Sequence, residues 1–241
     1  MKMYIEVHMI QNFAPANLNR DDTNNPKDCE FGGVRRARIS SQCIKRAIRT
    51  SRTFKEVIGQ GIAIRTRYLS RELHRRLADR GYPQEEVYLI ATTFPQALTN
   101  KRPIPKQAER TDIPLYIGDH EIEIIVEALC SQWEQVLEET KRFQQEKTQA
   151  KTPTIARLVR TILKEIKQAP AVPDVALFGR MLASHPRQFN VEAACQVAHA
   201  ISTHRVAMEM DFFTAVEELL KAEDEETGAA MMDVTGFNSA C

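Results

Sequence analysis

The residues best suited to chemistry lie between Val34 and Lys55. This segment holds eight basic side chains and no acidic one, although the chain of 241 residues has a formal net charge of only +1. The basic residues are Arg35, Arg36, Arg38, Lys45, Arg46, Arg49, Arg52 and Lys55. A block of one sign needs an anionic partner or a large solvated face.

The basic and apolar residues in the second half of this block recur at helical spacing. Ser40 or Ser41 is a suitable N-cap, and the pattern predicts a helix from Gln42 to Ser51. Three basic residues share one face of this helix: Lys45, Arg49 and Arg52. A helix N-terminus presents free N–H groups and a partial positive charge, so serine hydroxyl groups and a basic face at this end indicate phosphate as the ligand. A solvated basic face is the alternative interpretation.

Three aspartates precede the basic block: Asp21, Asp22 and Asp28. In a loop beside a nucleic-acid surface, such groups could hold Mg²⁺ or act as a base, which would make the chain a metal-dependent endoribonuclease. Turn formation and pairing with Arg20 or Lys27 is the stronger interpretation. We therefore expect no catalytic residue, and we keep the endoribonuclease as an alternative.

Composition places the chain among ordinary globular proteins, with 43% hydrophobic and 27% charged residues. No apolar run approaches the length of about 20 residues that a membrane span needs. The five cysteines are an odd number at wide spacing and include no C-x-x-C pair, which favours free thiols in a reducing cytoplasm. The sequence has no Walker loop, dinucleotide fingerprint or zinc-ligand set. We expect a cytoplasmic chain without a membrane segment, metal or cofactor.

Periodicity predicts the elements that surround the basic block. The predicted helices after it are Ser70–Arg80, Glu85–Ala97, Glu121–Lys147 and Thr154–Ile166. The last two carry long apolar stripes and are expected to pack as an antiparallel pair. Alternation predicts a half-buried strand from Met3 to Ile10. The segment Val175–Met181 is typical of a strand that ends in a glycine turn, and Val191–His204 is locally ambiguous between helix and strand.

The basic block also carries a family resemblance. From Asn17 onward the chain has N-L-N-R-D-D and then K-D-x-x-F-G-G-x-R-R-x-R-I-S-S-Q-x-x-K-R-A-x-R. The pattern continues as D-x-A-L-F-G-R-M from Asp174, A-H-A-I-S-T-H-R-V from Ala198 and D-F-F-T-A-V from Asp211. These motifs resemble the CasC family, the backbone subunit of the type I-E CRISPR surveillance complex Cascade. Between Thr53 and Val172 there is little similarity at the level of motifs.

The resemblance implies an α+β fold shaped like a hand. Residues 1–56 and 169–241 would form a palm that is a modified RNA-recognition-motif sheet. Residues 57–168 would be a helical insertion, the fingers, and residues 174–205 a thumb hairpin. The family pattern continues beyond Cys241, so the resemblance also predicts a palm that these residues leave incomplete. An interaction subunit that does not hold RNA is therefore a further alternative.

The resemblance implies a structural role in antiviral defence. Copies of such a subunit stack along CRISPR RNA as a helical filament, beside other Cascade subunits. They hold the sugar–phosphate backbone of the guide and leave its bases free to pair with a target DNA strand. Subunits of this kind in type I systems are not known as nucleases, so we expect no enzymatic activity.

Fourteen residues of this chain are the expected RNA contacts. They are Arg20, Lys27, Arg38, Ser40, Ser41, Gln42, Lys45, Arg46, Arg49, Phe178, Arg180, Met181, Thr203 and His204. In the thumb motif, Phe178 or Met181 would wedge against an unstacked base while Arg180 meets a phosphate. The resemblance places a strand through Ala198 to Val206, which makes Thr203 and His204 candidates for guide contact.

Overall fold

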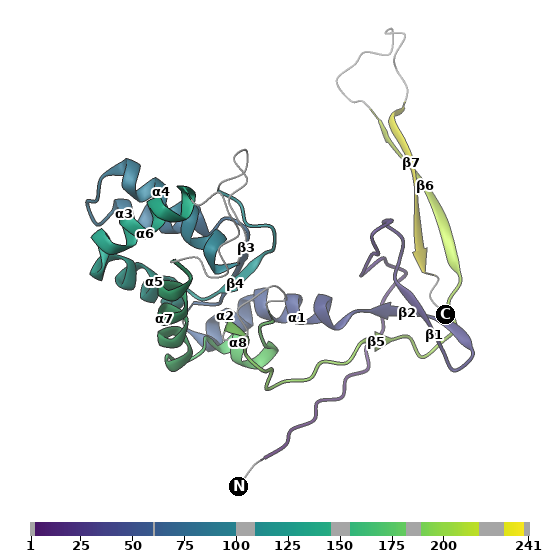
Figure 1. Cartoon of the computed structure of the whole chain (residues 1–241). Coiled ribbons are helices and arrows are strands. Elements are labelled where there is room, and N and C mark those ends of the chain that lie inside the picture. The colour runs from purple at the N-terminus through teal and green to yellow at the C-terminus, as the bar shows by residue number, and fades with distance from the viewer. Residues whose placement is uncertain are drawn as a thin grey trace. The chain divides into compact units, whose positions relative to one another are not determined.

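The computed structural model of the chain describes residues 3–59, 61–99, 109–145, 155–181, 189–216 and 229–238. The chain divides into two units (Figure 1). Unit 1 comprises Met1–Ala47 and Val197–Cys241, and unit 2 comprises Ile48–Gln196. Both contain helical residues and antiparallel strands, which confirms the α+β class. The helix of the basic block, α1 (Ser41–Thr50), spans the boundary in sequence.

Unit 1 contains two small antiparallel sheets. Their strands are β1 (Asp28–Phe31), β2 (Val34–Ile39), β5 (Ala200–Ile201), β6 (Met208–Val216) and β7 (Ala229–Asn238). The first sheet has the order β1-β2-β5, and β6 pairs with β7 in the second. Gly32 and Gly33 have φ values of 66° and 75°, which suits the tight two-residue turn between β1 and β2. The strand predicted from 198 to 206 thus shortens to β5.

The strand predicted from Met3 to Ile10 is wrong as a half-buried element. The segment is exposed, and it belongs to no sheet of the described residues. Its alternating pattern is real, yet a strand also needs a neighbouring backbone to bond with. Sequence periodicity cannot report whether that neighbour is present.

Unit 2 is built mainly from helices, and its described residues form one large and one small buried apolar cluster. Its helices are α2 (Arg52–Ile58), α3 (Leu69–Ala78), α4 (Gln84–Leu98), α5 (Asp119–Ser131), α6 (Trp133–Gln145), α7 (Ile155–Gln168) and α8 (Pro173–Phe178). Strands β3 (Ile64–Thr66) and β4 (Leu115–Ile117) form an antiparallel pair. Apolar side chains of α3 to α7 form one buried cluster, as their stripes predicted. The helices predicted at 70–80, 85–97 and 154–166 are confirmed within a few residues.

Two predictions in unit 2 are wrong. The stretch 121–147 forms two helices, because the chain leaves helical geometry at Gln132, where φ is −129° and ψ is 34°. Trp133 then turns inward, where its Nε1 donates to Glu86 at 2.9 Å. The second error is the strand predicted at 175–181. Pro173 starts α8 instead, since its fixed φ suits a first helical position, and Gly179 follows the end of the helix.

None of the described helices combines the length and apolar character that a membrane span requires.

Candidate nucleic-acid interface

The start of α1 is organised by Ser40. Its Oγ accepts a hydrogen bond from the backbone N–H of Cys43 at 3.3 Å, and its own N–H donates to Asn19 Oδ1 at 2.9 Å. Ser40 is therefore the N-cap, buried, with its polar groups occupied. Ser41 is half-buried and Gln42 is exposed, so these two residues present the first turn of the helix to solvent.

The loop before β1 is tied together by Asp21. Its carboxylate accepts hydrogen bonds from the N–H groups of Thr23 (2.9 Å) and Asn25 (2.8 Å), and from Thr23 Oγ1 (2.8 Å). These hydrogen bonds, led by the one from the Thr23 hydroxyl group, lower the pKa of Asp21. Arg20 closes the loop from outside, because its Nη1 donates to the Asn24 carbonyl at 3.0 Å and to Thr235 Oγ1 at 3.2 Å.

A pocket of about 220 Å³ lies between this loop and the first sheet. It is lined by Asp21, Asn25, Pro26, Lys27, Asp28, Arg35, Arg38 and Met208. Asp28 pairs with Arg35 at 2.5 Å. Lys27 and Arg38 form no ion pair within the described residues, and the Arg38 Nε is buried there without a hydrogen-bond partner. The pocket wall thus carries two cationic groups that an anion could neutralise.

The carboxylates of this region serve the loop and the sheet. Asp21 shapes a turn and Asp28 neutralises Arg35. No group of three or more His, Cys, Asp or Glu side chains suited to a metal ion occurs among the described residues. These contacts favour the structural interpretation of both aspartates over the nuclease alternative.

The basic residues of α1 divide into two kinds. Lys45 is half-buried and makes no ion pair or side-chain hydrogen bond with any described residue, and Arg46 is exposed. Arg49 instead forms an ion pair and a hydrogen bond with residues of unit 2. Its Nε lies 3.2 Å from Asp174 Oδ2, its Nη2 donates to the Ala63 carbonyl, and its side chain is only 16% exposed. Arg49 is therefore not part of an open basic ridge, and the single phosphate-facing stripe expected from the sequence is corrected here.

The side chain of Arg180 is also buried and paired inside unit 2. Its Nη1 lies 2.7 Å from Glu121 Oε2 and donates to the Tyr116 carbonyl at 3.1 Å, while its Nε donates to the Phe189 carbonyl at 2.7 Å. The side chains of Arg180 and Glu121 are 4% and 3% exposed. An arginine with this set of partners holds the protein together and does not present a free guanidinium to phosphate.

The other two thumb residues differ from each other. Phe178 is half-buried and stacks on Phe54, with ring centroids 6.3 Å apart. Met181 is 85% exposed, immediately after the buried Arg180. Phe178 is thus packed against another ring, whereas Met181 is exposed. Of these two side chains, only that of Met181 is accessible to a nucleic-acid base.

Thr203 and His204 lie beside β2 in unit 1. Arg36 Nη1 donates to the carbonyls of Ser202 (3.0 Å) and Thr203 (2.6 Å), and Ser202 Oγ donates to the His204 carbonyl at 2.8 Å. The Thr203 side chain is exposed and that of His204 is half-buried. The sequence did not predict this structural role of Arg36, which holds the segment against the sheet through carbonyl groups 166 and 167 positions away along the chain.

An exposed apolar face on the β6–β7 hairpin was also missed. The register sets Phe212 opposite Val234 and Thr214 opposite Met232. The apolar residues on this face are Met208, Met210, Phe212, Met232 and Val234, all exposed. The alternation in M-x-M-x-F from Met208 was the available signal. The hairpin lies outside 174–205, where a thumb hairpin was expected and where residues 182–188 fall outside the described part.

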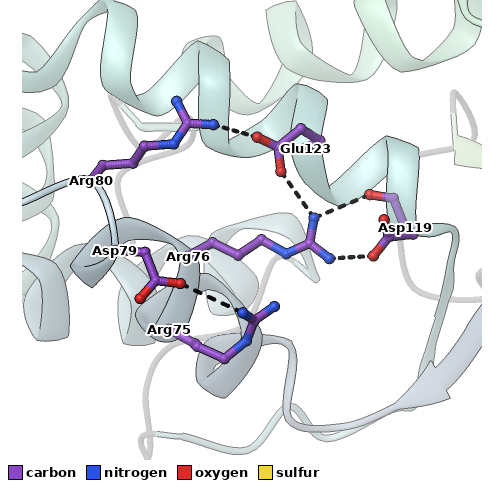
Figure 2. Close-up of a pocket in the computed structure, with 6 residues that line it drawn as sticks. All are labelled: Arg75, Arg76, Asp79, Arg80, Asp119 and Glu123. Carbon is purple, nitrogen blue, oxygen red and sulfur yellow. Dashed lines mark hydrogen bonds and ion pairs between the residues drawn. The ribbon is translucent and has the colours of Figure 1, made fainter.

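A second charged cluster lies in unit 2, around a pocket of about 380 Å³ (Figure 2). Arg76 is at its centre, with Nε 2.8 Å from Glu72 Oε1, Nη1 3.0 Å from Glu123 Oε2, and a further ion pair to Asp119. Burial alone would lower the pKa of Arg76, but the hydrogen bonds that its guanidinium donates to these carboxylates outweigh burial and raise the pKa. Acidic and basic groups balance in this cluster, so it joins α3 to α5 and offers no net charge to a nucleic acid.

Comparison with known proteins agrees with the sequence motifs. The family model described as "CT1975-like protein" matches residues 5–241. A solved chain described as "CRISPR RNA-guided surveillance complex, pre-nicking" is 29% identical, with a TM-score of 0.68, and the match covers 92% of this chain and 58% of that chain. Another, described as "CRISPR RNA-guided surveillance complex", is 28% identical, with a TM-score of 0.58, covering 78% of this chain and 55% of that one. No curated protein matches. The chain spans little more than half the length of these solved chains.

Proposed function

The chain belongs to the CT1975-like protein family, and on this premise we propose that it is a CRISPR RNA-binding backbone subunit of a type I-E Cascade surveillance complex. The observation that carries the proposal is the match to a chain of a CRISPR RNA-guided surveillance complex over 92% of this chain at 29% identity. In this role its partners are CRISPR RNA, the target DNA strand paired to it, further copies of the chain and other Cascade subunits, all in the cytoplasm.

Unit 1 provides the proposed grip on the guide backbone. Lys27 and Arg38 line the pocket and Lys45 lies on α1, and none of the three forms an ion pair within the described residues, so in this proposal they are the side chains that contact phosphates. Ser41 and Gln42 add polar contacts from the first turn of α1. Such contacts are independent of sequence, which suits a protein that accepts any guide.

Apolar side chains supply the second part of the proposed mechanism. Met181 in unit 2 and the exposed face of the β6–β7 hairpin in unit 1 each offer a surface against which an unstacked base can lie. The hairpin takes the thumb role in place of residues 174–205. The other guide bases stay free for pairing with target DNA in this proposal, so pairing supplies the specificity.

The remaining expected contacts act as positioning residues in this proposal. Ser40 caps α1 and Arg20 closes the loop, while Arg49, Arg180 and Phe178 pack within unit 2. Asp21 and Asp28 have structural partners, which supports a subunit without catalytic activity.

The first experiment is to purify the chain with its complex partners and to sequence the nucleic acid that accompanies it. Short RNAs of uniform length with repeat-derived ends are expected. A complex that assembles without RNA would overturn the proposal in favour of an interaction subunit. Divalent-dependent cleavage of the RNA, abolished by Asp21→Ala, Asp22→Ala or Asp28→Ala, would favour the endoribonuclease.

A double variant tests the proposed phosphate contacts directly. If about five phosphates are neutralised, log K for single-stranded RNA falls with log salt at a slope near −3.5, roughly −0.7 per contact. Arg38→Ala with Lys45→Ala should weaken RNA binding and make this slope shallower by about 1.4, since two contacts are lost. The control is Lys141→Ala with Arg142→Ala on α6, which removes the same charge from an exposed face of unit 2. Equal losses in both doubles would contradict the assignment.

A further inference from the structure

The pocket of unit 1 is lined by charged side chains of both signs. Its cationic side chains are those of Lys27, Arg35 and Arg38, and its carboxylates are those of Asp21 and Asp28. Three cations and two carboxylates give the wall a net charge of +1, which matches the single negative charge of one phosphodiester group. A pocket for phosphate alone is weakened by a carboxylate, because the two anions repel each other. The carboxylates therefore point to a ligand that is more than a phosphate.

Asp28 uses one of its two carboxylate oxygens inside the protein. Oδ2 accepts a hydrogen bond from Arg35 Nε at 2.5 Å, and Oδ1 makes no hydrogen bond with any described residue. The side chain of Asp28 is 26% exposed, so water is partly excluded from it. An ionised carboxylate only accepts hydrogen bonds, and a phosphodiester has no donor to offer. Asp28 Oδ1 is therefore an acceptor that a phosphate cannot satisfy.

Free donors lie in the same pocket as this acceptor. Lys27 forms no ion pair within the described residues, and Arg38 Nε is buried there without a hydrogen-bond partner. The pocket has a volume of about 220 Å³, which is below the roughly 300–1,000 Å³ of a site for a drug-sized ligand. It therefore suits one small group that carries both an anionic oxygen and a hydroxyl donor.

Met208 and Pro26 give the pocket an apolar side. Pro26 is buried, and Met208 is 44% exposed. Apolar side chains pack against the C–H groups of a sugar ring, whereas a bare phosphate has no apolar surface to cover. The cations, the free acceptor and the apolar side thus match the phosphate, the hydroxyl group and the ring of a ribose phosphate.

We infer that this pocket recognises the ribose of the guide: Lys27 and Arg38 bind a phosphate, and Asp28 Oδ1 accepts a hydrogen bond from the neighbouring 2′-hydroxyl group. The inference rests on the proposed binding of the guide backbone and adds the residue that selects RNA over DNA. The 2′-hydroxyl group is what distinguishes RNA from DNA at a given protein site. Deoxyribose leaves a half-buried carboxylate beside a phosphate without a donor, which lowers the affinity.

The test compares oligonucleotides of one sequence on the full chain. They are single-stranded RNA, single-stranded DNA, and RNA in which every 2′-hydroxyl group is replaced by fluorine. The fluorinated sugar keeps the pucker of ribose but cannot donate a hydrogen bond. Fluorescence anisotropy gives the dissociation constants, and RNA should bind at least about fivefold more tightly than each of the other two.

Two aspartate variants make the test specific to Asp28. Asp28→Ala removes the acceptor and the repulsion of phosphate, so DNA binding should strengthen and the ratio of RNA to DNA affinity should fall to about one. Loss of the fold would weaken both nucleic acids instead. The control is Asp22→Ala, which removes the same charge from the same loop at an exposed residue outside the pocket lining. This control should keep the ratio of the unchanged chain.

Three results would overturn the inference while RNA binding stands. They are equal affinity of the unchanged chain for RNA and DNA; equal affinity for RNA and fluorinated RNA, which would assign the preference to sugar pucker; and a preference for RNA that survives Asp28→Ala. Absence of binding to every oligonucleotide would overturn the proposed guide-binding function together with the inference.

Discussion

Unit 2 buries its large apolar side chains, whereas unit 1 leaves many of them exposed. In unit 2, helices α3 to α7 close around residues such as Ile90, Phe94 and Leu129, which are at most 1% exposed. In unit 1, small sheets carry Met210 and Phe212 in the open, at 60% and 61% exposure. The difference indicates that burial of apolar side chains contributes more folding free energy in unit 2 than in the described part of unit 1.

The largest expected contrast comes from truncating one phenylalanine in each unit. Phe94→Ala should lower the free energy of unfolding by about 3–5 kcal/mol, because it empties a closed core. Phe212→Ala should change it by less than about 0.5 kcal/mol, because that ring is exposed. Urea unfolding followed by far-ultraviolet circular dichroism measures both. Similar losses in the two variants would contradict the contrast between the units.

The second largest contrast is expected between a buried carboxylate and a half-buried one, in the free energy of unfolding that each contributes. Asp174 is fully buried and accepts hydrogen bonds from Tyr116 Oη at 2.6 Å and from the Ala63 N–H at 3.1 Å, besides pairing with Arg49. Asp174→Asn leaves the Arg49 charge without its counterion and should cost about 2–3 kcal/mol in urea unfolding. Asp28→Asn in unit 1 breaks an accessible ion pair and should cost less than about 1 kcal/mol. Equal costs would mean that unit 1 is as tightly held as unit 2.

The smallest expected effect is local to unit 1. Asp21→Asn weakens the acceptor for the N–H groups of Thr23 and Asn25, so their amide exchange should accelerate while the urea midpoint stays unchanged. The folded pKa of Asp21 lies below its ordinary value of 3.8, so the stabilisation of this loop is present above that value and is lost as pH falls through the lower folded pKa. A shift of the global midpoint in the Asn variant would show that the loop is coupled to the rest of the fold.

Local signals in the sequence account for much of the helical structure. The α1 helix follows from the Ser40 cap and its apolar–basic spacing, and α3, α4 and α7 follow from their stripes. The break at Gln132 did not follow, because the stripe continues across it. What sets the break is Trp133, which reaches Glu86, a residue 47 positions away.

The candidate interface was only partly predictable for a related reason. Arg49 and Arg180 have the residue type and spacing of phosphate ligands, and a basic motif alone cannot distinguish them from Lys45. Their acidic partners, Asp174 and Glu121, lie 125 and 59 positions away along the chain. Only the folded structure reveals which positive charges are already neutralised.

The environment of Trp133 has a consequence for spectroscopy. It is the single tryptophan of the chain, it is 8% exposed, and it stacks on Tyr82 with ring centroids 3.7 Å apart. Its emission therefore reports on the helical core of unit 2. A fluorescence melt of this chain would follow the loss of that core.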